Sequence, residues 1–188
     1  MTDLINIPLE YRTWTLEEYQ KMVELNILTE EDKVELLNGN IVRMSPIGNA
    51  HAAHVDRIEE WIKDTLQKKV IVRVQGPIVV EEDSNPEPDI AVLKRKEDFY
   101  FRDAPTAKDT LLVVEVADSS LEKDREIKGP IYAKGYVPEY WIINLKDSQV
   151  EIYLDPKEGI YSKALHLKEN QSFVSLLLGE VKVNKLLL

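Results

Sequence analysis

Residues 111–117 read LLVVEVA, an aliphatic and β-branched run that contains a single carboxylate, Glu115. Such a run is typical of a central strand that is buried on both faces. An ionised carboxylate is unfavourable in that environment unless a cation or a metal ion holds its charge. The sequence therefore predicts a partner group close to Glu115 in the folded chain.

A second acidic residue, Asp89, precedes another short apolar run at residues 90–93 and follows the Pro-rich segment at residues 86–88. A turn in this segment would place Asp89 at the end of a strand. Two carboxylates on neighbouring strands can share one divalent cation, which favours a common site. A simpler assignment stays open for each residue alone: Glu115 pairs with an Arg or Lys, and Asp89 caps a turn.

The composition limits the class of protein. The 188 residues are 44% hydrophobic, and we expect one domain over residues 1–188. The chain has no cysteine, which excludes disulfides and thiolate metal ligands. It shows neither a signal peptide nor an apolar run of transmembrane length, so we expect a cytoplasmic protein without membrane contact. The net charge of -10 argues against a broad phosphate-binding surface but leaves room for a small basic groove.

Two local signals define the N-terminal part of the chain. Thr15 and Glu18 form a capping box, which predicts a helix over residues 15–25. Asn38-Gly39 between two apolar segments predicts a β-hairpin over residues 33–44. Glu35 on its first strand is either a third acidic site residue or the cross-strand partner of Arg43.

The next segment has apolar residues at helical spacing and predicts a helix of about 18 residues that ends near Leu66. His51 begins the buried face of this helix and is a candidate for the border of the site, whereas His54 is expected to be exposed or at the edge of that face. Residues 70–82 predict a bent strand interrupted by Gly76-Pro77, and Gln75 beside the bend is a second border candidate.

Residues 94–102 combine the basic run Lys94-Arg95-Lys96 with Phe99-Tyr100-Phe101-Arg102. Basic residues between aromatic ones suit contact with a nucleic acid. A surface loop whose aromatic rings tuck beneath it is the alternative.

A third helix is predicted over residues 119–134, with a kink at Pro130. Asp124, Lys128 and Tyr132 would lie on one of its faces, and Asp124 and Tyr132 are further border candidates. The alternative for Asp124 and Lys128 is an exposed ion pair of little energetic weight. Strands are predicted at residues 138–145 and 150–154, followed by short strands.

Several of these motifs, taken in order, resemble one known family. They are Glu35, Pro88-Asp89, Glu115-Val116-Ala117, Asp124 with Lys128, Tyr132-Ala133 and Pro138-Glu139-Tyr140-Trp141. Their order is similar to that of the restriction endonuclease family of the Uma two type, in the PD-(D/E)XK nuclease superfamily. The resemblance implies an α/β (α+β) fold with a restriction-endonuclease-like core, namely a mixed β-sheet flanked by helices, with an N-terminal helix and β-hairpin.

The resemblance also implies a metal-dependent endonuclease that hydrolyses phosphodiester bonds in DNA. Asp89, Glu115 and Glu35 would bind Mg²⁺, and Mn²⁺ would substitute for it. This suits the chemistry, because a metal lowers the pKa of the attacking water and hard oxygen ligands suit Mg²⁺. The superfamily's usual lysine, two residues after the Glu, is replaced by Ala117, and Lys128 on the following helix would take its catalytic role.

Two other functions are consistent with the sequence. A catalytically inactive nucleic-acid-binding or regulatory module that retains the nuclease fold is favoured by the net charge of -10 and by Ala117. A structural homodimer is the third possibility, and a homodimer is compatible with the nuclease as well.

Overall fold

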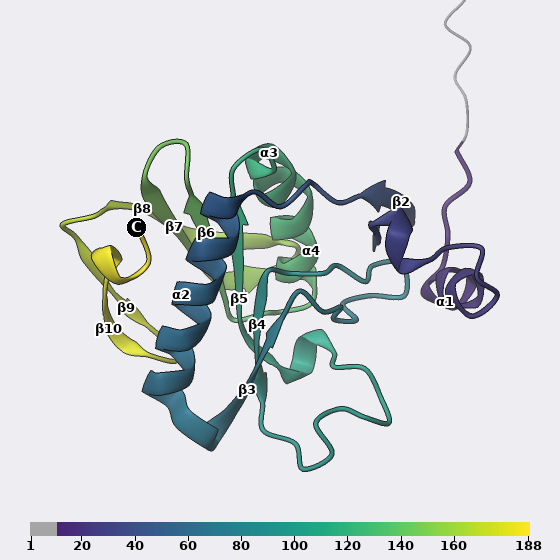
Figure 1. Ribbon diagram of the computed structural model, residues 1–188, viewed down its shortest axis with the longest axis horizontal. Helices are drawn as coiled ribbons and strands as arrows, with labels where there is room; N and C mark the ends of the chain where they lie inside the picture. Colours follow the sequence, from purple (N-terminus) through teal and green to yellow (C-terminus); the bar gives the residue numbers. More distant parts are fainter. Residues whose placement is uncertain (1–10) are drawn as a thin grey trace, which may run out of the picture.

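The computed structural model describes residues 11–188, and its centre is a mixed six-stranded sheet in the order β3-β4-β5-β6-β7-β8 (Figure 1). Neighbouring strands are antiparallel except β5 and β6, which run parallel. The strands of this sheet are β3 (Val70–Val74), β4 (Ile90–Lys94), β5 (Thr110–Ala117), β6 (Glu139–Asn144), β7 (Gln149–Lys157) and β8 (Ile160–Lys168). The predicted α+β fold is confirmed.

Strand β5 contains the LLVVEVA run and lies inside the sheet, with β4 on one side and β6 on the other. Because side chains alternate along a strand, its residues serve two separate cores. Leu112, Val114 and Val116 pack in one apolar core, whereas Val113 and Ala117 pack in the other. Glu115 shares the face of Val113 and Ala117, so it points away from the larger core.

Helix α2 (Asn49–Leu66) covers the first face of the sheet, and its length matches the prediction (Figure 1). Val55, Ile58 and Ile62 are its buried apolar residues. The prediction of an exposed His54 is wrong, because His54 is buried. Its Nδ1 donates to the Ala50 carbonyl at 2.7 Å, and its Nε2 accepts from the Leu188 amide at 3.1 Å.

The C-terminal segment completes this first core with a second hairpin. It consists of β9 (Ser172–Ser175), β10 (Gly179–Lys182) and the short helix η5 (Val183–Lys185). Phe173 packs edge-on against Trp141 of β6, with ring centroids 5.1 Å apart. Buried Glu139 accepts hydrogen bonds from Trp141, from Ser175 and from the Leu176 amide, which ties the hairpin to the sheet.

The two N-terminal predictions are confirmed. Helix α1 (Leu16–Glu24) begins after a complete Thr15–Glu18 capping box. Strands β1 (Val34–Leu37) and β2 (Asn40–Arg43) pair as a hairpin through Asn38 and Gly39, both with positive φ. The proposed ladder pair is wrong, because Glu35 lies opposite Val42 rather than Arg43. The short helix η1 (Glu30–Asp32) connects α1 to this hairpin.

The opposite face of the sheet is covered by the segment between β5 and β6. It is formed by α3 (Leu121–Lys123), the π-helical turn η4 (Asp124–Lys128) and α4 (Gly129–Lys134). The predicted kink at Pro130 is replaced by this π-helical turn, and Pro130 lies in the first turn of α4 directly after it. The turn sets the positions of Asp124 and Lys128 relative to the sheet.

Some of the remaining segments differ from the sequence-based prediction in length. The strand before Gly76 ends at Val74, and Val79 beyond it forms only an isolated bridge with Thr106. Strand β8 is nine residues long rather than short. The short helices η2 (Gln67–Lys69) and η3 (Ala107–Asp109) precede β3 and β5.

The aromatic residues of the loop after β4 are partly tucked beneath it and partly exposed. Tyr100 is buried, and its hydroxyl donates to the Lys94 carbonyl at 2.9 Å. Phe101 is 91% exposed, and Arg95 lies over the ring of the exposed Phe99. Within residues 11–188, no helix combines the length and the apolar character that a membrane span requires.

Candidate active site

A pocket of about 600 Å³ opens beside the first hairpin, between the start of α2 and the segment α3–η4. Seven of the eight residues selected from the sequence line it: Glu35, His51, Gln75, Asp89, Glu115, Asp124 and Lys128. The eighth, Tyr132, is fully buried behind the pocket and contacts Glu115. The structure thus brings together residues from six separate parts of the chain.

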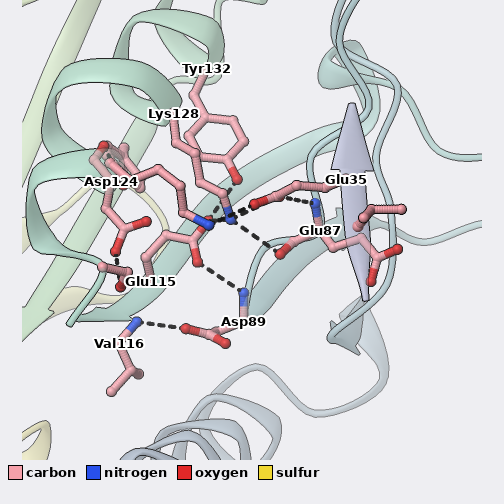
Figure 2. Close-up of polar contacts among 12 residues, drawn as sticks. Glu35, Glu87, Asp89, Glu115, Val116, Asp124, Lys128 and Tyr132 are labelled. Atoms are coloured by element: carbon pink, nitrogen blue, oxygen red, sulfur yellow. Dashed lines mark hydrogen bonds and ion pairs between the residues drawn. The ribbon is translucent and has the colours of Figure 1, made fainter. Parts of the chain in front are cut away.

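Glu115 has the partner that its buried position predicts. Its Oε1 accepts a hydrogen bond from the Tyr132 hydroxyl at 2.8 Å and lies 3.0 Å from the Lys128 ammonium (Figure 2). Burial raises the pKa of Glu115, and the charge of Lys128 partly counteracts this increase. The cation that the strand requires is therefore a lysine from the helical segment that covers this face of the sheet.

Asp89 lies next to Glu115 at the end of β4. Its backbone amide donates to Glu115 Oε2 at 3.3 Å, and its own Oδ2 accepts from the Val116 amide at 2.8 Å (Figure 2). His51 Nε2 donates to the same Oδ2 at 2.9 Å. Contacts from β5 and α2 therefore fix the direction of this carboxylate, and the Gln75 backbone amide holds the Asp89 backbone by donating to its carbonyl at 3.1 Å.

Lys128 is buried, which corrects the interpretation of an exposed ion pair with Asp124. Its ammonium contacts Glu115, lies 3.1 Å from Glu35 Oε2 and donates to the Glu87 carbonyl at 3.3 Å (Figure 2). Burial alone would lower the pKa of Lys128, but the surrounding carboxylates raise it above its ordinary value. The lysine is therefore charged and aimed at the acidic side of the pocket.

Glu35 is buried and engages two lysines at once. Its Oε1 accepts from Lys123 at 2.9 Å, and its Oε2 accepts from the Glu87 amide at 3.1 Å in addition to contacting Lys128. Both oxygens are thus occupied. In this arrangement Glu35 balances lysine charge, whereas the family resemblance had included it in a three-carboxylate metal cluster.

The π-helical turn that carries Lys128 is anchored at three points. The Ser120 hydroxyl donates to Asp124 Oδ2 at 2.6 Å, and the Tyr140 hydroxyl donates to the Asp124 carbonyl at 3.0 Å. Arg125 binds the fully buried Glu151 of β7, with its Nε 2.8 Å from Oε2. Asp124 therefore orients the turn and forms no ion pair with Lys128.

Sequence reasoning missed Lys123, Arg125 and Glu151. Glu151 lies on a strand in which apolar and polar side chains alternate. An acidic residue in such a strand normally faces the solvent, and no local signal marks Glu151 as buried. Besides Arg125, its carboxylate accepts hydrogen bonds from the Tyr153 hydroxyl and from the Asn144 side chain. Only the pairing of β7 with β6 and the packing of η4 over them reveal this network.

The Glu151 network predicts a specific loss of stability in acid. Burial alone would raise the pKa of Glu151, but hydrogen bonds from Arg125, Tyr153 and Asn144 lower it to about 2. A carboxyl whose folded pKa lies below its unfolded value of about 4.3 stabilises the protein above that pH and loses this contribution as the pH falls toward 2. The contribution corresponds to about 3 kcal/mol.

Urea unfolding of wild type and Glu151→Gln between neutral pH and pH 2 tests this. The variant should lose less stability than wild type across the acidic range. Glu17→Gln, which alters an exposed ion pair with Lys21, is the matched control and should follow wild type. If the free energy of unfolding fell equally with pH in wild type and in Glu151→Gln, the lowered pKa of Glu151 would be contradicted.

The donor set of the pocket fits a hard divalent cation held by two carboxylates. Among residues 11–188, no three His, Asp or Glu side chains are grouped so that they alone could hold a metal ion. Asp89 Oδ1 accepts no hydrogen bond from any described residue, and Glu115 Oε2 accepts only the 3.3 Å contact from the Asp89 amide. Mg²⁺ commonly binds one or two carboxylates and takes its other ligands from water and substrate phosphate.

A mixed sheet flanked by helices, with an acidic pair and a buried lysine in one pocket, defines a nuclease-like α+β protein. The model of the Uma2 family, described as "Putative restriction endonuclease", matches residues 16–184, and the chain belongs to this family. The family resemblance seen in the sequence is thereby confirmed.

The fold is also similar to a solved structure from Anabaena variabilis, described as "a putative nuclease belonging to DUF820". The two chains share 16% sequence identity with a TM-score of 0.70, and the match covers 92% of this chain and 96% of that chain. At this identity the similarity concerns the fold. Comparison with curated proteins found no match.

Proposed function

We propose that the protein is a Mg²⁺-dependent endonuclease that hydrolyses phosphodiester bonds in DNA. The observation that carries this proposal is the arrangement of Asp89, Glu115 and Lys128 around one pocket, with the Lys128 ammonium 3.0 Å from Glu115. Membership of the Uma2 family supports the same reaction class.

Asp89 and Glu115 would hold the metal ion, because each carboxylate keeps one oxygen with at most a weak contact to the protein. Mg²⁺ would lower the pKa of a water nucleophile and neutralise charge on the phosphate, and Mn²⁺ would substitute for it. His51 and the Val116 amide fix the other Asp89 oxygen, and Tyr132 fixes the other Glu115 oxygen. These contacts keep the two carboxylates oriented before substrate binds.

Lys128 would supply the positive charge that Ala117 cannot provide. Its ammonium lies between Glu115 and Glu35 in the pocket wall, where its charge would act on a phosphate held beside Asp89 and Glu115. Because the surrounding carboxylates keep it protonated and its N–H groups face Glu115, Glu35 and the Glu87 carbonyl, it would act as an electrostatic stabiliser rather than as a base.

Cleavage of plasmid and of single-stranded DNA with Mg²⁺, with Mn²⁺ and with a chelator tests the proposal. We expect nicked and linear products with either metal and none with the chelator. The variant Asp89→Asn should be inactive under all conditions, which excludes a contaminating nuclease. DNA binding without cleavage would instead support a non-catalytic nucleic-acid-binding module.

A further inference from the structure

Glu35 binds two lysines. Its carboxylate contacts the ammonium groups of Lys123 on Oε1 and of Lys128 on Oε2, and it also accepts a hydrogen bond from the Glu87 amide. Lys128 is shared with buried Glu115, so two lysines balance two buried carboxylates. Lys123 is the lysine of this group that contacts Glu35 alone.

The two lysines differ in their access to the pocket. The side chain of Lys123 is 18% exposed, whereas that of Lys128 is 5% exposed. Lys123 is the last residue of α3 and lines the pocket beside Asp124. Glu35 thus holds an accessible ammonium in a fixed position on the pocket wall.

Other cations line the same pocket. Lys33 and Arg43 come from the base of the β1–β2 hairpin. They lie among carboxylates, so the pocket offers separate positive points rather than a continuous basic surface. Such points suit a phosphate backbone that is bound at a few positions only.

The geometry points to Lys123 as a phosphate-binding residue, with Glu35 as the residue that positions it. Lys123 would contact a non-bridging oxygen of a phosphodiester group as the nucleic-acid strand crosses the pocket. This inference rests on the proposed function and deepens it, because it assigns substrate binding to a residue outside the group Asp89, Glu115 and Lys128. Lysine suits this role as a compact point charge at the end of a flexible chain.

The test measures DNA binding separately from cleavage. Anisotropy titrations with a labelled short DNA duplex and with the single strand would be run in Ca²⁺ buffer and in chelator, from about 50 to 200 mM salt. The variants are Lys123→Ala, Lys123→Arg and Lys63→Ala. Lys63 is the matched control, because it is also paired with a glutamate, Glu59, but lies on the exposed surface of α2 outside the pocket.

Lys123→Ala should weaken binding about five- to tenfold near 0.1 M salt and should reduce the salt slope by about one. Lys123→Arg should restore most of the affinity, and Lys63→Ala should match wild type. Lys128 and the Glu87 amide still pair with Glu35 in Lys123→Ala, so the fold should persist, as a thermal melt would show.

Wild-type affinity and salt slope in Lys123→Ala would overturn the inference, and so would an equal loss in Lys63→Ala. Absence of DNA binding by the wild type would overturn it as well. Wild-type protein that binds DNA through Lys123 but does not cleave it with Mg²⁺ would refute the proposed reaction and leave this inference standing. Unchanged DNA binding in Lys123→Ala, together with cleavage that does not depend on Lys123, would refute this inference and leave the proposed reaction standing.

Discussion

Replacing Lys128 with alanine is expected to lower the free energy of unfolding by about 3–5 kcal/mol and to abolish DNA cleavage. Lys128 is the only cation within 4.0 Å of Glu115 among the described residues, and Glu115 is buried. Removing it leaves a carboxylate without a counter-charge in the interior. If Lys128 instead formed an exposed ion pair with Asp124, the substitution would hardly change the free energy of unfolding.

Urea unfolding without divalent cations measures this loss, and two further variants identify its cause. Lys128→Ala combined with Glu115→Gln should recover much of the stability but none of the activity, because the buried charge is gone while the site stays incomplete. Lys123→Ala should lose much less stability, because Glu35 keeps Lys128 as its partner. A Lys128→Ala protein as stable as wild type would show that the buried ion pair does not form in solution.

Mn²⁺ binding is expected to fall about a hundredfold or more in Asp89→Asn and in Glu115→Gln. Loss of groups that merely orient a metal ligand reduces affinity about ten- to hundredfold, so loss of a direct ligand should reach at least that range. Each substitution removes a formal charge from the proposed metal site and keeps the shape of the side chain. Titration calorimetry with Mn²⁺ provides the measurement, and cleavage should be lost in both variants.

Glu35→Gln is the matched control for this titration. It is the same kind of substitution in the same pocket, but both Glu35 oxygens bind lysines rather than facing an open position. We expect this variant to keep most of its Mn²⁺ affinity. A loss as large as that of Asp89→Asn would instead return Glu35 to the metal ligands that the family resemblance implies, and equal affinity in all variants would refute the metal site.

Local patterns in the sequence were sufficient for much of the architecture. The capping box at Thr15 and the Asn38-Gly39 turn are formed by residues a few positions apart, so the sequence indicates both of them locally. The apolar run around Glu115 required a central strand, and a charge in that strand required a partner. The order of the motifs by itself indicates the family.

The identity of the partners was decided by the tertiary structure. Glu35 and Lys123 are 88 residues apart in the sequence, and they meet because the hairpin packs beside the segment that follows β5. The burial of Lys128 depends on the π-helical turn, and that turn depends on Glu151 and Tyr140 from other strands. A sequence pattern reports which side chains are polar, but the charge, orientation and availability of each depend on neighbours that only the folded chain supplies.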